Sequence, residues 1–432
     1  MLTRNVMNVE RREKGYTKED FNNSIDILLR LIKDWVNGVP TASVHASDLQ
    51  WEVLSELAWR IDLTSVVYRQ LKASNIHAPE QVMVNLKNRY LNESANLMKR
   101  EAALARVIQA MDGQGIVPVF FKGAAFAYTI YPDSVCRTMD DIDLWISEFD
   151  MVPAQKALER IGYVRKEERT QPLRLEGGYE REVQMIGTWP GTGLVELHGF
   201  VLAGGWMRYT TAIDQDSIRE RLVPLEVQGR HALTLSPEDA VIQLALHIAV
   251  SHQMLGNGVV RSLMDAALFG RHSCIDWELV ARRALAWKVA TATWLVLRLA
   301  CDMAGLAGAE TALQRLAPPR WKKRLLSVWI NSRGDWLWKQ HWLSIRSAFS
   351  NEPRNPSMTE RNARPAHGPL RFVLQLLLID HAADVCRMVA RGIWPDRVWL
   401  LARCGKADIP ARLNYLGEAV SGRVVGRKKS KS

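Results

Sequence analysis

The spacing of apolar residues divides the chain into helical and extended regions. In residues 21–111 apolar side chains recur three and four positions apart, as in DILLRLIKDWV, which is typical of amphipathic helices. Residues 81–111 contain neither Gly nor Pro and are rich in helix-forming residues. Gly113 and Gly115 then mark the end of that helix. We therefore predict an N-terminal helical region over residues 1–111.

Between residues 112 and 235 the pattern changes to that of short strands. Three runs are β-branched or alternate polar and apolar residues: GIVPVFFKG (115–123), DDIDLWI (140–146) and GLVELHGFVL (193–202). Helices are predicted between them at 124–131 and 151–161, and a hairpin or irregular segment at 163–183. The order strand, helix, strand, helix, strand predicts a mixed α/β core in this region.

The chain after residue 235 is mostly helical. Ser236 is an expected N-cap, and Pro237 stands at the first helical position. The predicted segments are a helical domain (236–345), a linker or loop (346–369), a C-terminal helical segment (370–420) and a basic disordered tail (421–432). The expected fold class is therefore α+β: a small mixed β-sheet core flanked by N-terminal helices and a mainly helical C-terminal region.

Composition narrows the classes of protein and partner. Hydrophobic residues make up 47% of the 432 residues, which excludes a mainly disordered chain. The net charge of +11 favours phosphate-bearing partners, although the basic tail carries part of that excess. The five cysteines are scattered without a CxxC pair, which argues against a disulfide framework or a zinc finger. No signal peptide or membrane-spanning run is apparent, so we expect a soluble, cytoplasmic protein.

Three acidic residues carry the strongest indication of chemistry. Asp141 and Asp143 are two apart on a predicted strand, so both carboxylates lie on one face while Ile142 and Leu144 face the core. Glu196 has the same setting on a later strand. Like charges this close are tolerable around a divalent cation, and Mg²⁺ prefers oxygen ligands. If the two strands are neighbours, the three acids converge on one or two divalent cations. They are then predicted metal ligands and catalytic groups for in-line attack on a nucleoside triphosphate (NTP), with Mg²⁺ or Mn²⁺ as cofactor.

Four further residues are predicted to bind the nucleotide or the metal. Gly123, at a strand-to-helix turn, would let backbone N–H groups approach phosphate oxygens, and Lys122 and Arg137 could pair with phosphates. Lys122 could equally be a solvated turn residue, and Arg137 could brace the neighbouring aspartates. His198 shares a strand face with Glu196 and could ligate metal, accept a proton, contact the substrate or make a structural hydrogen bond.

Residues 120–146, FFKGAAFAYTIYPDSVCRTMDDIDLWI, resemble the core motif of the DNA polymerase β-like nucleotidyltransferase superfamily. They are most similar to a bacterial family of poorly characterised nucleotidyltransferases with the pattern LKGxA, Tyr-Pro, Arg, DxDL. The similarity extends through VELH around Glu196 to the SPED, His247 and Arg261–Asp265 positions, and covers roughly residues 54–304. It implies that Asp141 and Asp143 ligate metal, that Glu196 is the third acid and that Gly123 is the glycine of the phosphate turn.

The resemblance implies an enzyme of the EC 2.7.7 type. It would transfer a nucleoside monophosphate from NTP to an unidentified acceptor, such as a small molecule, peptide or sugar, and release pyrophosphate. Two alternatives stay open. The positive charge and a cluster of tryptophans (Trp329, Trp336, Trp338, Trp342) suggest an RNA- or tRNA-modifying enzyme or toxin, although a nucleic-acid partner is not favoured. A catalytically silent nucleotide-binding scaffold is the other. The acceptor, the base and the oligomeric state are open.

Two pairs of polar residues in the helical region have structural interpretations. His247 and His252 are five apart, and residues at that spacing on an α-helix do not share a face, so we expect packing or capping roles for them. Arg261 and Asp265 are four apart on a predicted helix, so a local ion pair is the expected arrangement.

Overall fold

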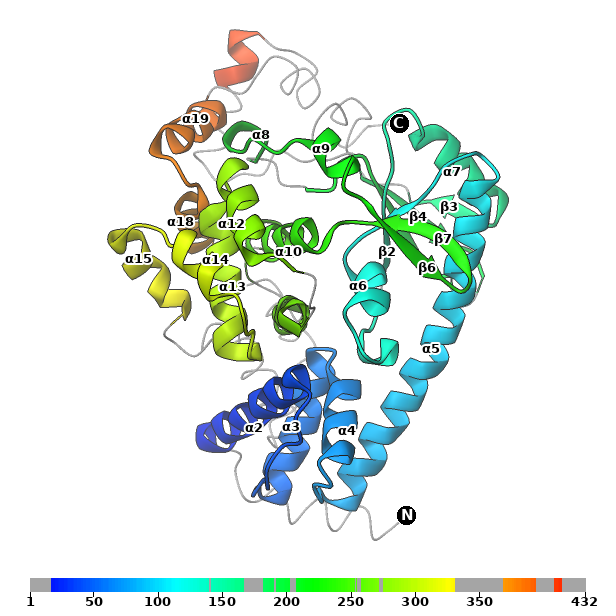
Figure 1. Cartoon of the computed structure of the whole chain (residues 1–432), viewed down its shortest axis with the longest axis vertical. Helices are drawn as coiled ribbons and strands as arrows, with labels where there is room; N and C mark the ends of the chain where they lie inside the picture. Colours follow the sequence, from blue (N-terminus) through cyan, green and yellow to red (C-terminus); the bar gives the residue numbers. More distant parts are fainter. Residues whose placement is uncertain are drawn as a thin grey trace.

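The structure is a computed structural model of the chain. It describes residues 17–139, 141–166, 182–189, 192–202, 207–252, 254, 258–271, 275–330, 368–393 and 408–413 (Figure 1). The predicted tail at 421–432, nearly all of the predicted linker at 346–369, and Trp336, Trp338 and Trp342 lie outside these residues. In the described residues the fold is α+β, as predicted.

The described residues of the N-terminal region form four helices: α2 (Lys18–Asn37), α3 (Asp48–Arg60), α4 (Thr64–Ala73) and α5 (Glu80–Asp112). Thr17 and Ser47 cap the first two of them by accepting hydrogen bonds from backbone N–H groups three residues on. Helix α2 ends at Gly38, whose φ of 66° is a left-handed conformation that favours glycine. The long helix α5 leaves this group and runs along the sheet (Figure 1).

The described strands form one seven-stranded mixed sheet with the order β3-β4-β5-β2-β1-β7-β6. The strands are β1 (Val119–Phe120), β2 (Asp141–Trp145), β3 (Tyr163–Arg165), β4 (Glu182–Gly187), β5 (Leu194–His198), β6 (Val223–Val227) and β7 (Arg230–Thr234). The three predicted strands are present as β1, β2 and β5. Strand β1 is shorter than predicted, because Pro118 has no N–H to donate and Lys122 has a positive φ.

The hairpin of β6 and β7 was not predicted from the sequence. Its strands pair antiparallel from Val223 with Thr234 to Val227 with Arg230. Gln228 and Gly229 form the turn with φ values of 52° and 70°, the two positive angles of a tight hairpin turn. Strand β7 then pairs in parallel with β1, so this hairpin completes the sheet beside the turn that leads into α6.

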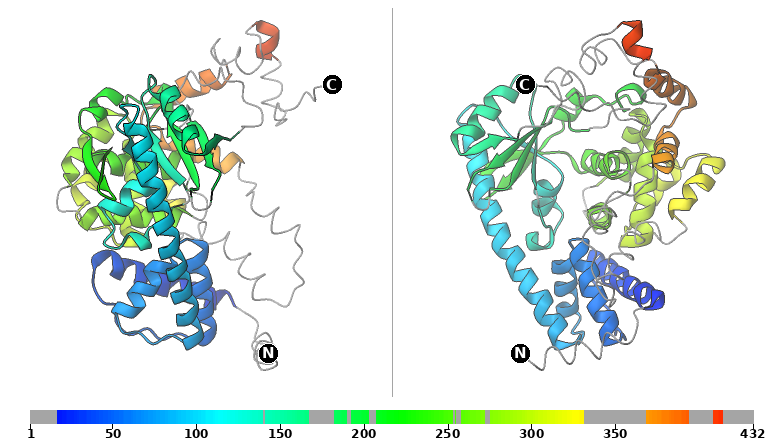
Figure 2. Two further views of the ribbon diagram at one scale, coloured as in Figure 1. Left: turned by 90° about the vertical axis from the view of Figure 1, so that its right-hand side faces the viewer. Right: turned by 180° about the vertical axis from the view of Figure 1, so that it is seen from behind.

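Helices lie on both sides of the sheet. Helices α5 and α7 (Met151–Arg160) contact each other on one side, whereas α6 (Gly123–Thr129) and the C-terminal helices lie on the other (Figures 1 and 2). Ile142 and Leu144 of β2 are fully buried. Helix α6 contacts β2 on the second side.

The C-terminal region begins as predicted, with Ser236 capping α10 (Pro237–Leu246) and accepting from the backbone N–H of Asp239. A π-helical turn, His247–Ser251, follows directly. The remaining helices are α8 (Met207–Thr210), α9 (Gln215–Arg219), α11 (Gly258–Leu268), α12 (Trp277–Ala286), α13 (Ala290–Ala304), α14 (Glu310–Arg315), α15 (Arg320–Ile330), α18 (Gly368–Leu378) and α19 (Ala382–Ile393). No helix in the described ranges is long and apolar enough to cross a membrane.

Candidate active site

The polar face of β2 lies beside the polar face of β5. The two strands are parallel neighbours, and their register places Asp143 directly opposite Glu196 and Trp145 opposite His198. Because side chains alternate along a strand, Asp143, Glu196 and His198 all project from the same face of the sheet. The prediction that the acids of these two strands meet in space is confirmed for Asp143 and Glu196.

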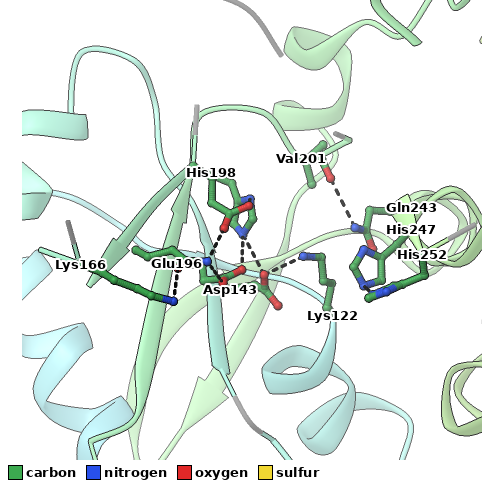
Figure 3. A network of polar contacts seen from close by, with 11 residues as sticks. Lys122, Asp143, Lys166, Glu196, His198, Val201, Gln243, His247 and His252 are labelled. Atoms are coloured by element: carbon green, nitrogen blue, oxygen red, sulfur yellow. Dashed lines mark hydrogen bonds and ion pairs between the residues drawn. The ribbon is translucent and has the colours of Figure 1, made fainter. Parts of the chain in front are cut away.

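These three side chains make a compact group of ligand atoms. One atom from each of Asp143, Glu196 and His198 lies within 4.8 Å of the other two. His198 Nε2 is 2.8 Å from Asp143 Oδ1 and 3.6 Å from Glu196 Oε2 (Figure 3). Gln184 of β4 donates a 2.8 Å hydrogen bond to Glu196 Oε1, which holds that carboxylate at the site. Two carboxylates and an imidazole fit a divalent cation: the oxygens suit Mg²⁺ and Mn²⁺, and the nitrogen suits other transition metals such as Zn²⁺.

Lys122 brings a positive charge to the same place. Its Nζ lies 2.7 Å from Asp143 Oδ1, and both side chains are largely buried. Lys122 is the residue before α6 and has a φ of 56°, a conformation that costs a non-glycine residue free energy and is found disproportionately at functional sites. The backbone at this strand-to-helix turn thus directs the lysine side chain toward the acids.

The carboxylate of Asp143 and its two nitrogen-bearing partners stabilise each other's charged forms. Burial opposes ionisation of Asp143, but the charge of Lys122 and the hydrogen bond from His198 outweigh it and hold the pKa of Asp143 well below its usual range. Burial also opposes protonation of Lys122 and His198, yet their carboxylate partners raise the pKa of each. Asp143 is therefore ionised at neutral pH, as a metal ligand must be.

A comparison with protein families found a match that covers this site. A family model described as "Uncharacterised nucleotidyltransferase" matches residues 47–305, more than half of the chain. The chain belongs to this family. The matched region includes the whole sheet, the Asp143–Glu196–His198 group and α10 to α13. Comparisons with curated proteins and with solved structures found no match.

In this nucleotidyltransferase family member, Asp141 stands apart from the compact group. It begins β2 opposite Leu194 and faces the same side as Asp143, with its side chain partly buried. The three-residue group with ligand atoms in mutual reach contains His198 where the sequence predicted Asp141. The metal-binding role of Asp141 stays a prediction, and so does that of His198, whose 2.8 Å contact with Asp143 also fits a structural hydrogen bond.

Arg137 has a structural partner that the sequence did not reveal. Its Nε lies 2.9 Å and 3.2 Å from the two carboxylate oxygens of Asp265, and Tyr131 donates a 2.5 Å hydrogen bond to the same carboxylate. Arg137 is 7% exposed and Asp265 is fully buried. Arg137 Nη1 also donates to the carbonyl oxygen of Thr138, which precedes β2. Arg137 therefore braces the approach to the acids, while its predicted phosphate contact stays a prediction.

Gly123 packs directly against that guanidinium group. A Cβ atom at Gly123 would lie 3.3 Å from Arg137 Nη1, tighter than most side-chain contacts. The glycine therefore gives Arg137 room beside the first turn of α6. Its predicted role in cradling phosphates is an expectation of the sequence alone.

A residue of the helical region also contacts the segment before β2. Arg261 of α11 binds Asp62 of the N-terminal region at 3.1 Å and donates to the hydroxyl of Thr138 at 2.9 Å. Asp265, four residues on, has Arg137 as its partner. Both residues of the pair predicted from spacing thus make longer-range contacts, which tie three parts of the chain to the segment before β2.

The prediction that His247 and His252 do not share a face is wrong. The π-helical turn carries the backbone hydrogen bond from His252 N–H to the carbonyl oxygen of His247, 2.9 Å, a five-residue spacing. This winding brings the two imidazole Nε2 atoms within 2.9 Å of each other. The pair was missed because α-helical periodicity was assumed. Figure 3 shows both imidazoles beside Lys122, on the other side from Asp143.

Proposed function

We propose that this protein is a Mg²⁺- or Mn²⁺-dependent enzyme that moves a nucleoside monophosphate from NTP to an acceptor hydroxyl, phosphate or amine. The observation that carries the proposal is the convergence of Asp143, Glu196 and His198, with ligand atoms within 4.8 Å, in a chain of a nucleotidyltransferase family. The acceptor class that we favour is a small molecule, peptide or sugar.

The reaction is an in-line displacement at the α-phosphorus. A lone pair of the acceptor atom forms the new bond to the α-phosphorus, and the bond from that phosphorus to the bridging oxygen breaks, so that pyrophosphate leaves. The acceptor proton passes to a carboxylate, for which we propose Glu196. A divalent cation held by Asp143, Glu196 and His198, with Asp141 beside them, would supply Lewis-acid stabilisation of the developing negative charge.

Lys122 has two roles in this proposal. Without nucleotide its ammonium group pairs with Asp143 and compensates that buried charge. With nucleotide bound it would exchange the carboxylate for a phosphate oxygen, because Asp143 then serves as a metal ligand. Gly123 and Arg137 belong to the same turn, and we propose that Gly123 allows close approach of the phosphates while Arg137 keeps the segment before β2 in place.

The test uses NTP labelled at either end of the triphosphate. The chain is incubated with [α-³²P]NTP or [γ-³²P]NTP, Mg²⁺ or Mn²⁺, and panels of small molecules, peptides and sugars. Nucleotidyl transfer predicts that the α label moves to an acceptor and that the γ label appears in pyrophosphate. The variant Glu196→Gln should lose the transfer, and Glu226→Gln, at an exposed glutamate of β6, is the matched control.

Three outcomes would contradict the proposal. If Glu196→Gln transferred the α label as fast as Glu226→Gln, the site would lie elsewhere. If the γ label moved to the acceptor, the protein would be a phosphoryl transferase. Metal-dependent NTP binding with no transfer of either label to any acceptor of the panels would favour the silent-scaffold alternative.

A further inference from the structure

His247 and His252 occupy a position where the helical region meets the polar face of the sheet. Their Nε2 atoms are 2.9 Å apart, and this contact depends on the π-helical turn that follows α10. Such turns are rare and are frequent at functional sites. Solvent reaches part of both histidines, and their rings lie beside Lys122 (Figure 3).

The groups that act electrostatically on the pair come from four elements. They are Lys122 before α6, Asp143 of β2, His198 of β5 and Arg261 of α11. Asp143 is the only negative charge among these four, and Lys122 and His198 already bind it. Among these four groups, the positive charges that lower the pKa values of the imidazoles therefore outnumber the one negative charge that raises them.

Burial and these positive charges together set the protonation of the pair. Burial, followed by the positive charge of Lys122, holds the pKa of His247 well below its usual range and lowers the pKa of His252 as well. Both imidazoles are therefore neutral at pH 7, since the ordinary pKa of histidine is about 6.5. An anion placed between the imidazoles and Lys122 would add negative charge beside them and so raise their pKa values.

Helix α10, which leads into the π-helical turn, carries a buried side chain with an unused hydrogen-bond acceptor. Gln243 lies one turn before His247, is 3% exposed and donates from Nε2 to the carbonyl oxygen of Val201 at 3.4 Å. Its buried Oε1 has no hydrogen-bond partner among the described residues. This amide oxygen is therefore an acceptor that a further hydrogen-bond donor can use.

We propose that His247 and His252, together with Lys122, form a subsite for the outer phosphates of a polyphosphate chain. This inference rests on the proposed function, because it assigns the leaving pyrophosphate part of the NTP to this side of Lys122. Imidazole N–H groups and the ammonium group would donate to phosphate oxygens. The negative charge of the phosphates would in turn favour protonated imidazole, so that binding takes up a proton from solution.

Proton uptake can be measured directly with an inorganic probe. Tripolyphosphate with Mg²⁺ is titrated into the full chain by calorimetry at about pH 7, in buffers that differ in ionisation enthalpy. The wild type should take up as much as about one proton on binding. His247→Gln should lose most of that uptake and bind about tenfold more weakly or worse, as expected for loss of a hydrogen bond to a charged group. His231→Gln, at an exposed histidine of β7, is the matched control.

The outcomes separate this inference from the proposed function. Equal uptake and affinity in His247→Gln and His231→Gln would overturn the subsite, as would failure of the wild type to bind tripolyphosphate. Uptake that depends on His247 in a protein that transfers no α label would support the subsite while overturning the proposed function. Should His247→Gln fold poorly, His252→Gln replaces it, with the same reduction expected.

Discussion

Lys122 Nζ lies 2.7 Å from Asp143 Oδ1, so an ion pair joins the turn before α6 to the centre of β2. Asp143 is 2% exposed. Removing only one partner of such a buried ion pair destabilises the folded protein, because the remaining charge stays buried without a partner. The same contact that stabilises the site without ligand would have to be exchanged when a cation binds Asp143.

The first prediction separates stability from chemistry at this pair. Asp143→Asn should lower the melting temperature, with a cost of about 3 kcal/mol from the unpaired Lys122. The double variant Lys122→Met/Asp143→Asn should recover much of that stability. Neither variant should bind NTP in a metal-dependent way. Differential scanning fluorimetry and NTP titration measure the two effects, and a single variant as stable as the wild type would show that the pair contributes little.

A second prediction concerns the ion pair of Arg137 and Asp265, which holds the segment before β2. Asp265→Asn leaves Arg137 buried with its charge unpaired, so the free energy of unfolding should fall by about 3 kcal/mol or more. Tyr131→Phe removes one hydrogen bond to the same carboxylate and should cost about 1 kcal/mol. Thermal unfolding measures both. A larger loss for Tyr131→Phe than for Asp265→Asn would contradict the assignment of the main interaction to Arg137.

A third prediction is a pH dependence of stability that His247 and His252 share. The folded pKa of each is lowered, so below about pH 6.5 the unfolded chain binds protons at these positions that the folded chain does not. The contribution of the two histidines to the free energy of unfolding is therefore complete above that pH. It is lost as the pH falls toward their pKa values in the folded state.

The melting temperature, followed from about pH 7.5 to 5, checks this dependence. His247→Gln should show a smaller decline than the wild type, while His231→Gln should decline as the wild type does. Identical slopes in all three proteins would mean that the imidazole pair titrates in the folded state as it does in the unfolded chain.

Local alternation made the acidic strands predictable. In DDIDLWI and GLVELHGFVL every second residue is apolar, which identified Asp143 and Glu196 as polar-face residues before their strands were known to be neighbours. The predicted helix start at Ser236 was likewise a local signal, and the structure confirms it.

Long-range pairing and unusual helical winding were not predictable in this way. Arg137 and Asp265 are 128 positions apart, and nothing in either local sequence indicates the other. The β6–β7 hairpin was missed because Pro224 lowers the strand signal of its first half. The contact of His247 with His252 depends on a π-helical turn, which a search at α-helical period excludes.

The central claim is that Asp143 and Glu196 bind a divalent cation together with a nucleotide. Titration calorimetry of ATP, GTP, CTP and UTP with Mg²⁺ or Mn²⁺, on the wild type, Glu196→Gln and the Glu226→Gln control, tests it most directly. We expect metal-dependent binding of at least one nucleotide by the wild type and the control, weakened about tenfold or more in Glu196→Gln. Equal binding by all three proteins, or binding that is indifferent to the metal, would contradict it.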